Sequence, residues 1–520
     1  MLDYTMGALV ERCGASYGTD NAVIHGDTHI THAEQRSRIR RTGRALLGLG
    51  LEPGDRVAIL MSDRPELLDV YYGAMWAGLA VVPLNARLGR DDHRYILEDS
   101  GARVVAHDAS SAERVADVAD GIDQLISVED EAALPGSGPP LSRLLADQPD
   151  GPGMPDTAPD DLLGIFYTGG TTGRPKGAEH THRSFVAAVV SEKLEMGLGE
   201  ADRFVHVAPL THASGLFVMP VWMRGGANII LGHYDPDELI ATIEAERVTA
   251  TMMVPTMIYV LLDTVSDKSA DLSSLETVIY GASPIGQERL LAALDRFGPI
   301  FSQLYGQTEA PNQLTTLRKA DHAAAVASGD LSPLGSCGRP VAIAQVRIVD
   351  DDLGDVEAGS PGEIVARGPH LMRAYHNRPE ETEEALRGGW LHTGDIAQMD
   401  DRSFVSIVDR KKDMIISGGF NVYPKEVEAT LFSHPAVRDV CVIGVPDDKW
   451  GEAVKAVVVT DPDTVVEASE LIAWVKERKG SVLTPKTVEF SEAIPLTAVG
   501  KHDKPALRAQ YWDGRGRAVN

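Results

Sequence analysis

Short apolar runs alternate with longer helical stretches through the first part of the chain. Apolar residues cluster at 57–61 and 79–82, and each run has the length of a buried strand. The segment 67–84, which includes the second run, is strongly apolar, but an aspartate, two glycines and a proline interrupt it. It therefore predicts a buried helix followed by a strand, and not a membrane span. Such alternation is typical of α/β units with parallel strands.

Three more apolar runs each lead into a glycine-containing turn. They lie at 163–167, 278–280 and 300–304, and the turns that follow them contain GGTTG, GASP and YGQTE. After the first turn, apolar residues at helical spacing in 185–190 predict a helix, which gives the order strand, glycine loop, helix. In open α/β sheets, ligands collect outside the carboxyl ends of the strands. We expect the three turns to line one crevice.

The pattern changes after residue 409 to that of a small α+β domain. Its elements are a helix at 425–432, strands at 437–445 and 453–459, and a helix at 468–478. The junction DRKKD at 409–413 is strongly charged, as expected of a solvated linker, and a hinge is the functional alternative. The sequence favours neither. Earlier in the chain, the proline- and glycine-rich stretch 135–159 predicts a surface loop.

Composition indicates a multidomain enzyme. The 520 residues exceed what one hydrophobic core usually supports, and contents of 43% hydrophobic and 24% charged residues argue against disorder. The net charge of −27 argues against nucleic acid as a partner, and anionic ligands would need local cations or Mg²⁺. The 3 cysteines lie far apart, which suits a reduced cytosol. Asp3 and Glu11 stand where a signal peptide needs a basic end and an apolar core, so we expect a cytoplasmic protein.

The segment YTGGTTGRPKG at 167–177 carries the clearest chemistry. Its glycines allow left-handed turns and close approach to a ligand, its threonines offer hydroxyl donors, and Arg174 and Lys176 add positive charge around the rigid Pro175. Such a loop suits a polyphosphate. Lys176 is followed by Gly177 and not by the Ser or Thr that ligates magnesium in kinase-type and GTPase loops, which argues against those classes.

Four further segments follow the loop. They are YGQTEA at 305–310, WLHTGD at 390–395, DRKKDMIISGGFNVYP at 409–424 and PLTAVGKHDKPALR at 495–508. Together with the loop, they resemble the acyl-adenylate-forming enzymes, which include acyl-CoA ligases, non-ribosomal-peptide adenylation domains and luciferases. The resemblance covers nearly the whole chain. It implies an α/β fold in which a large N-terminal domain of several subdomains with doubly wound sheets (1–409) precedes a small mobile α+β domain (410–520).

The resemblance implies a site for ATP and Mg²⁺. Matching positions are Thr168, Gly169, Gly170, Thr171, Thr172, Gly173, Lys176, Gly281, Ala282, Ser283, Tyr305, Gly306, Thr308, Glu309, Asp395 and Arg410. The loop would hold the phosphates, Tyr305 would lie against adenine, and Thr308 would lie beside the α-phosphate. Glu309 matches the Mg²⁺ ligand. Asp395 and Arg410 would bind the ribose hydroxyls. The family commonly has Ser at position 169, so Gly169 loses or replaces one hydroxyl contact to phosphate.

Two half-reactions also follow from the resemblance. Lys501 matches the catalytic lysine that bridges the carboxylate and the α-phosphate, while Lys176 and Mg²⁺ steady the departing pyrophosphate. Lys412 matches the hinge about which the small domain rotates. Gly418 and Gly419 match a glycine turn along the pantetheine passage to coenzyme A, where a side chain would obstruct a narrow channel. The motif around these glycines contains no added segment, which favours a CoA ligase over carrier-protein-directed fatty acyl-AMP ligases.

The carboxylic acid is expected to bind near His212, which matches a gating position of the acyl or aryl pocket, and near Ala282, Gly306 and residues 310–312. None of these residues is an anion suited to an α-ammonium group or a permanent cation for a second carboxylate. We therefore expect an apolar fatty or aromatic monocarboxylate as the substrate.

Other acceptors and roles are open at this point. An acyl-AMP ligase that transfers to a carrier-protein pantetheine or to an amine is the alternative, and the sequence does not decide between these acceptors and coenzyme A. A non-catalytic nucleotide-binding module is disfavoured because the catalytic lysine, the magnesium carboxylate and the ribose acid are all present. The expected partners are small molecules, with no nucleic acid, no integral membrane segment and a homodimer as a candidate assembly.

Overall fold

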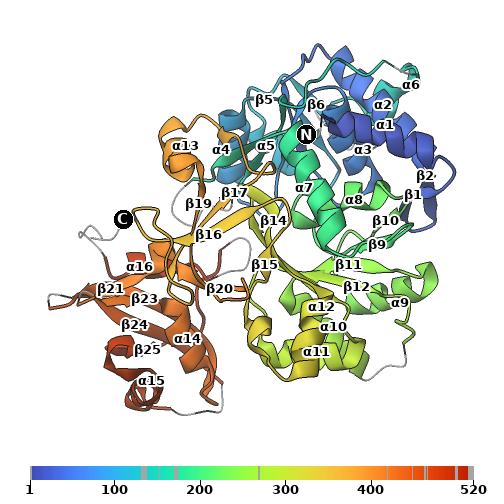
Figure 1. Ribbon diagram of the computed structural model, residues 1–520. Helices are drawn as coiled ribbons and strands as arrows, with labels where there is room; N and C mark the ends of the chain where they lie inside the picture. Colours follow the sequence, from blue (N-terminus) through green and yellow to red (C-terminus); the bar gives the residue numbers. More distant parts are fainter. Residues whose placement is uncertain are drawn as a thin grey trace. The chain divides into compact units, whose positions relative to one another are not determined.

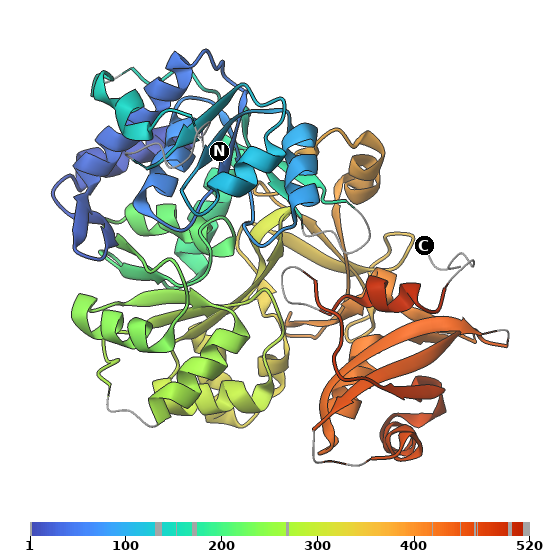
Figure 2. The same ribbon diagram turned by 180° about the vertical axis from the view of Figure 1, so that it is seen from behind.

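The computed structural model describes residues 3–129, 138–151, 153–168, 174–266, 270–418, 420–447, 449–461, 464, 466–497 and 502–512. They form two compact units (Figures 1 and 2). The first unit comprises residues up to 168 together with 175–346 and 366–391. The second comprises Arg174, Arg347–Val365 and the residues from 392 onward. The predicted domain division after residue 409 stays a prediction.

The first unit contains a sheet of nine strands, counted over the described residues, in the order β15-β14-β13-β12-β11-β9-β10-β1-β2. The strands are β1 Asn21–His25, β2 Thr28–Thr31, β9 Arg203–His206, β10 Ala227–Ile230, β11 Ala250–Met253, β12 Thr277–Tyr280, β13 Phe301–Gln307, β14 Ala310–Leu317 and β15 Arg339–Pro340. Pairings from β1 through β10, β9, β11 and β12 to β13 are parallel, and β13 pairs antiparallel with β14.

A second sheet of the same unit has the order β18-β8-β7-β4-β3-β5-β6 over the described residues. Its strands are β3 Arg56–Leu60, β4 Ala80–Pro83, β5 Ala102–His107, β6 Gln124–Ser127, β7 Leu162–Tyr167, β8 Gly177–Thr181 and β18 Ala374–Tyr375. The helices of the unit are α1 Met6–Ser16, α2 His32–Gly48, α3 Pro65–Trp76, α4 Arg90–Ser100, α5 Ala112–Val118, α6 Leu141–Ala146, α7 His182–Glu195, η1 Ala213–Phe217, α8 Val218–Trp222, α9 Pro236–Glu246, α10 Pro255–Ser266, α11 Gln287–Phe297, α12 Lys319–Ser328, η2 Ser332–Gly335, α13 Pro379–Ala385 and η3 Arg387–Gly389.

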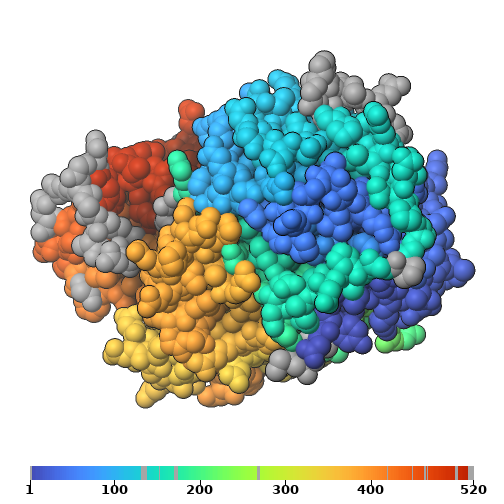
Figure 3. Space-filling view, turned by 90° about the horizontal axis from the view of Figure 1, so that it is seen from above, coloured from blue at the N-terminus to red at the C-terminus, as the bar shows by residue number. Residues whose placement is uncertain are grey.

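The α/β pattern predicted near the N-terminus is confirmed. Strands β3 and β4 are parallel, and α3 lies between them in the chain with nearly all of its side chains buried. A helix that is apolar on all sides must be covered on all sides, and α3 packs against both α1 and α2. Blue and cyan segments from the N-terminal part of the chain adjoin on the outer face of the unit (Figure 3). Among the described residues, no helix has both the length and the apolar character of a membrane span.

The predicted loop at 135–159 is wrong in part, because it contains helix α6. Leu141 is buried in the core of the first unit, and Arg41 of α2 donates a hydrogen bond to the Leu145 carbonyl oxygen at 2.6 Å. The prolines and glycines of this stretch lie outside the short helix, and tertiary contacts stabilise the helix.

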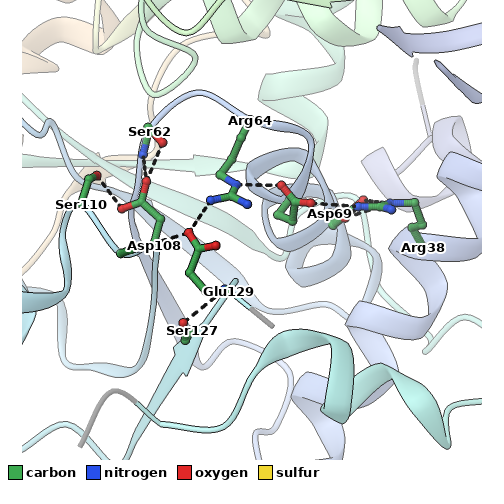
Figure 4. A network of polar contacts seen from close by, with 10 residues as sticks. Arg38, Ser62, Arg64, Asp69, Asp108, Ser110, Ser127 and Glu129 are labelled. Carbon is green, nitrogen blue, oxygen red and sulfur yellow. Dashed lines mark hydrogen bonds and ion pairs between the residues drawn. The ribbon is translucent and has the colours of Figure 1, made fainter. Parts of the chain in front are cut away.

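The carboxyl ends of β3, β5 and β6 are joined by polar side chains (Figure 4). Asp108 accepts hydrogen bonds from the Ser62 amide at 2.8 Å and from the Ser110 hydroxyl at 2.8 Å. Arg64 pairs with Glu129 at 2.7 Å. The polar groups at this edge of the sheet are therefore paired with one another.

The second unit contains a four-stranded sheet and, closer to the C-terminus, a small α+β fold. The four-stranded sheet is made of β16 Gln345–Val349, β17 Gly362–Arg367, β19 Leu391–Met399 and β20 Val405–Arg410, of which residues 345–346, 366–367 and 391 belong to the first unit. The α+β fold is made of η4 Lys411–Asp413, β21 Ile415–Ser417, β22 Phe420–Val422, α14 Pro424–Phe432, β23 Val437–Asp447, β24 Gly451–Thr460, α15 Ala468–Leu483, β25 Thr487–Phe490 and α16 Lys504–Ala509.

The helices and strands predicted after residue 409 are confirmed as α14, β23, β24 and α15. Their apolar faces meet in one core that includes Val427, Val442, Val454 and Leu471, all fully buried. The predicted fold class is confirmed as well: a large N-terminal part built on several sheets and a small C-terminal α+β part. The mobility of the small part stays a prediction.

Candidate active site

The glycine loop joins two antiparallel strands, and the predicted order of strand, loop and helix is wrong. Tyr167 at the end of β7 pairs with Gly177 at the start of β8, and the Thr168 amide donates to the Lys176 carbonyl oxygen at 2.9 Å. Gly169, Gly170, Thr171, Thr172 and Gly173 lie outside the described residues. The stem nevertheless fixes Thr168 and Lys176 as neighbours across a closed hairpin.

Helix α7 begins only after β8, and its own residues cap it. The Ser184 amide donates to the Thr181 hydroxyl at 3.1 Å, and the Thr181 amide donates to the Ser184 hydroxyl at 3.0 Å. This reciprocal cap satisfies the N-terminal donors that a phosphate would otherwise use. Donors for a phosphate must therefore come from the loop and from Lys176, and not from the helix N-terminus.

The motif YGQTE is also placed differently from the prediction. Residues 305–307 continue strand β13, and the turn consists of Thr308 and Glu309 alone. His180 of β8 donates from Nε2 to the Thr308 carbonyl oxygen at 2.8 Å. Burial lowers the pKa of His180 to about 4, so this imidazole is neutral and serves to hold the turn. No motif in the sequence pointed to His180.

Two residues predicted to bind phosphate and magnesium meet at Tyr375. The Tyr375 hydroxyl donates to Glu309 Oε1 at 2.5 Å, and Lys176 Nζ lies 5.2 Å from the centre of the Tyr375 ring. Strand β18 brings the tyrosine there, because Tyr375 pairs with Ala178 of β8. Glu309 is half-buried and offers the hard carboxylate oxygens that Mg²⁺ prefers as ligands, so its chemistry fits the metal role, which stays a prediction. Sequence reasoning missed Tyr375.

The predicted nucleotide turn after β12 lies close to β13. A side chain at Gly281 would approach the Leu304 carbonyl oxygen to 2.6 Å, so glycine permits the close packing of these strands. Ala282 is exposed and has a φ of 65°, a left-handed conformation that costs a non-glycine residue about 1–3 kcal/mol and is concentrated at functional sites. Ser283 and Tyr305 are half-buried. The adenine contact of Tyr305 stays a prediction.

Gly306 makes room for a bulge in the neighbouring strand. Tyr305 pairs with Thr315 and Gln307 with Ala310, so residues 311–314 bulge opposite Gly306. A Cβ atom at Gly306 would come within 2.4 Å of the Asn312 carbonyl carbon. Asn312 has a φ of 57°, which asparagine tolerates better than most residues. Bulges of this kind re-aim side chains next to active sites.

We predict that Gly306→Ala lowers the free energy of unfolding by about 1–3 kcal/mol, because the added methyl group must displace the backbone of the bulge. Urea unfolding measures the change. Gly335→Ala is the matched control, since nothing lies within 4 Å of a Cβ atom at that position, and it should stay within about 0.5 kcal/mol of the parent. Equal stability of the two variants would contradict the prediction.

His212, predicted to gate the acyl pocket, lies exposed at the start of η1 on a loop held at two points. The Asn85 side-chain amide donates to His212 Nε2 at 3.0 Å, and the Leu210 amide donates to Asp63 Oδ1 at 3.0 Å. Burial raises the pKa of Asp63 to about 6. Asp63 follows β3 and Asn85 follows β4 of the seven-stranded sheet. The loop that carries His212 is therefore held by elements far away in the sequence.

In the second unit, the predicted ribose pair is formed. Arg410 Nε lies 2.8 Å from Asp395 Oδ1, and the two residues are cross-strand partners on β20 and β19. Asp395 is buried in a strand, with its amide donating to the Thr393 hydroxyl at 3.1 Å. A buried carboxylate beside an exposed guanidinium is suited to accept hydrogen bonds from vicinal hydroxyls.

The charged junction at 409–413 is not a solvated linker throughout, which corrects that expectation. Asp409 is 1% exposed and accepts hydrogen bonds from the Arg410 and Lys425 amides at 2.7 and 2.8 Å. Asp413 pairs with Arg508 of the last motif at 2.8 Å. Burial lowers the pKa of Lys412. The junction is thus anchored on both sides of Lys412, whose hinge role stays a prediction.

Gly418 turns the hairpin between β21 and β22. Its φ is 60°, its amide donates to the Trp450 carbonyl oxygen at 2.8 Å, and a Cβ atom there would come within 2.5 Å of the Trp450 ring. Glycine is therefore required by packing against Trp450 as well as by backbone conformation. Gly419 lies outside the described residues, and so does Lys501, although Leu496 and His502 on either side of it pair with each other.

Three comparisons place the chain among known proteins. The family model of the AMP-binding enzymes matches residues 10–376, and the model of the AMP-binding enzyme C-terminal domain matches residues 426–501. The medium/long-chain-fatty-acid–CoA ligase FadD8 of Mycobacterium tuberculosis is 42% identical over 95% of this chain and 88% of its own length. A feruloyl-CoA synthase of an Amycolatopsis species is 39% identical over 94% of this chain and 96% of its own.

The fold also matches solved structures. The amide bond synthetase McbA from Marinactinospora thermotolerans superposes with a TM-score of 0.87 at 29% identity, over 97% of this chain and 99% of its own. The family models match residues in both units, and the relatives and the solved structure each cover at least 94% of the chain. The chain belongs to the AMP-binding enzyme family, in the acyl-CoA ligase branch of the adenylate-forming enzymes.

Proposed function

We propose that the chain adenylates a monocarboxylic acid with a largely apolar body, releases pyrophosphate and transfers the acyl group to coenzyme A. The observation that carries the proposal is the meeting of Lys176 and Glu309 at Tyr375, which brings a phosphate-binding cation and a hard carboxylate together. A polyphosphate needs both, because its own charge repels the attacking carboxylate.

The predicted site residues near the phosphates and adenine each have a defined task in the adenylation step. Lys176 donates to the departing pyrophosphate, and Thr308 contributes a donor beside the α-phosphate. Glu309 would hold Mg²⁺, which when bound neutralises phosphate charge and orients the leaving group. The loop 169–173 and the turn at 281–283 would enclose the nucleotide, with Tyr305 against adenine.

The second unit supplies the ribose contacts and the catalytic lysine in this proposal. Asp395 and Arg410 bind the ribose hydroxyls, a role supported by their burial and 2.8 Å pairing. Lys501 donates to the carboxylate and to the α-phosphate as charge redistributes in the transition state. This role is assigned to Lys501 from the PLTAVGK match alone.

Thioester formation requires the lysine to leave and a thiol to enter. We assign this change to rotation of residues 410–520 about Lys412, after which Gly418 and Gly419 line the pantetheine passage. The 2.8 Å pair of Asp413 with Arg508 supports a small domain that moves as one piece, because it ties the last motif to the junction beside Lys412.

The names of the relatives support an apolar monocarboxylate as the acid. FadD8 is named for medium- and long-chain fatty acids, and the Amycolatopsis enzyme is named for ferulate, an aromatic acid. Both acids carry one carboxylate on a large body with much apolar surface. The second candidate function is amide formation from the adenylate, which the likeness to the amide bond synthetase McbA favours.

A panel of carboxylic acids tests the proposal by acid-dependent exchange of labelled pyrophosphate into ATP. We expect exchange with fatty or aromatic acids and little with short dicarboxylates or amino acids. The product formed with coenzyme A, a pantetheinylated carrier protein or an amine is then identified by mass. Exchange with no acid would overturn adenylation, and an amide as the main product would establish the second candidate.

A further inference from the structure

A buried carboxyl group lies directly behind the bulge of β14. Glu192 of α7 is fully buried, and its Oε1 accepts a hydrogen bond from Asn312 Nδ2 at 2.7 Å. Its Oε2 has no hydrogen-bond partner among the residues that the structure describes. Burial raises the pKa of Glu192 to about 8, so at neutral pH the group is a protonated acid whose hydroxyl lacks an acceptor. A buried polar atom left without a partner is unfavourable and calls for a ligand or an ordered water.

The surroundings tie this group to the expected acid site. Asn312 also donates to the Ala213 carbonyl oxygen at 3.0 Å, and Ala213 follows His212 in the chain. The Asn312 backbone packs against Gly306 across the hairpin. Glu192 is therefore linked through one asparagine to two of the positions where the acyl group is expected, and the bulge directs that asparagine toward it.

We propose that Glu192 is a specificity-determining residue that donates a hydrogen bond to an oxygen atom on the body of the acyl group. The substrate would then be an oxygenated monocarboxylate, with a hydroxyl, methoxy or keto oxygen remote from the reacting carboxylate. This inference rests on the proposed adenylation function and narrows its substrate class.

The chemistry favours an acceptor oxygen over other groups. An acyl group that ends in hydrocarbon would leave the Glu192 hydroxyl without a hydrogen-bond acceptor or water. A second carboxylate on the acyl group would add a buried anion without a cation to pair with it. An uncharged oxygen accepts the hydrogen bond at no such cost. A site built around such a bond discriminates strongly, because an analogue without the oxygen leaves the buried donor unpaired.

The test uses matched acids and three variants. Acids that differ by one oxygen, such as cinnamate and 4-hydroxycinnamate or octanoate and 8-hydroxyoctanoate, are compared by kcat/KM for pyrophosphate exchange. Their non-hydrolysable acyl-sulfamoyl adenosine analogues are compared by Kd. The variants are Glu192→Leu, Glu192→Gln, which keeps a neutral donor of similar size, and Ser191→Ala, which removes another buried hydroxyl of the same helix that has no partner in the described part of the chain.

We expect the parent protein to prefer the oxygenated member of at least one pair by at least about tenfold, in kcat/KM and in Kd. Glu192→Leu should lose that preference, mainly through weaker use of the oxygenated acid, while Glu192→Gln and Ser191→Ala retain it. An unchanged ratio in Glu192→Leu, with exchange intact, would overturn the inference and leave Glu192 as the partner of a buried water. Absence of exchange with every acid would instead overturn the proposed function. If Glu192→Leu does not fold, the parent protein still tests the inference. A parent that shows no preference for the oxygenated acid of any pair, with Glu192→Gln showing none either, would overturn the inference.

Discussion

Lys501→Ala is expected to lower acid-dependent pyrophosphate exchange by at least about 10²-fold. In the proposed mechanism the lysine donates to oxygens that gain negative charge only as the carboxylate attacks the α-phosphate, and removal of one such donor costs about 10²–10³ in rate. Thioester formation from preformed acyl-adenylate should change little, because the proposed mechanism withdraws Lys501 before the thiol attacks. The two half-reactions are measured separately, by exchange of labelled pyrophosphate and by thioester formed from synthetic acyl-adenylate and coenzyme A.

Lys476→Ala is the matched control, since Lys476 is an exposed lysine of the same small fold on α15. It should leave both half-reactions unchanged. Equal loss of both activities in Lys501→Ala would contradict the assignment of the lysine to adenylation alone. Such a result would indicate a general role of residues 495–508 in the stability of the second unit, to which Arg508 already contributes.

Glu309→Gln should reduce exchange by about 10²-fold or more and raise the Mg²⁺ concentration needed for half-maximal rate. The substitution keeps the size of the side chain and removes the charge, and a metal that stabilises phosphate charge contributes several kcal/mol to the transition state, where each 1.36 kcal/mol is about tenfold in rate. Titration of exchange with Mg²⁺ gives both quantities. Calorimetric binding of ATP with and without Mg²⁺ measures the loss of metal-dependent affinity directly.

Tyr375→Phe separates the charge of Glu309 from its placement. It removes the hydroxyl that holds Glu309 Oε1 and keeps the ring over which Lys176 lies. Its effect should be smaller, about tenfold, because outer contacts of a metal ligand typically contribute 10–100-fold. If Glu309→Gln retained the parent's dependence on Mg²⁺, Glu309 would not be the metal ligand, and the contact with Tyr375 would have to be explained by packing alone.

Segments with strong local signals were predicted correctly from the sequence. Strands β3, β4 and β7, the buried helix α3 and the elements after residue 409 all have the hydrophobic period or the uninterrupted apolar run that their burial requires. The prediction failed where strand residues were interpreted as a turn or as the polar stretch before a helix. The strand β8 and the continuation of β13 through residues 305–307 are short, polar and recognisable only by the strand beside them.

Burial of polar residues was the other source of error. Asp409 lies in a highly charged segment that resembles a solvated junction. It nevertheless accepts two backbone hydrogen bonds in the interior of its unit. Glu192 and Tyr375 belonged to no motif, since the side-chain hydrogen bonds that single them out join Glu192 to Asn312 and Tyr375 to Glu309, more than 60 positions away. The fate of a charged side chain depends on its partners, and partners at this separation have no local signature in a sequence.

For this protein, the sequence alone determined the kind of chemistry, because the residues that touch phosphate, ribose and the reacting carboxylate must have particular side chains at particular places in short motifs. It also determined the division into a large α/β part and a small α+β part, since hydrophobic periodicity is a local property. The tertiary structure decided that the strands on either side of the glycine loop are antiparallel neighbours and that Tyr375 contacts both Glu309 and Lys176. It also decided that Glu192 is buried with one oxygen lacking a partner among the described residues. These features arise from packing between distant segments, which sets backbone geometry and protonation through contacts that no local pattern encodes.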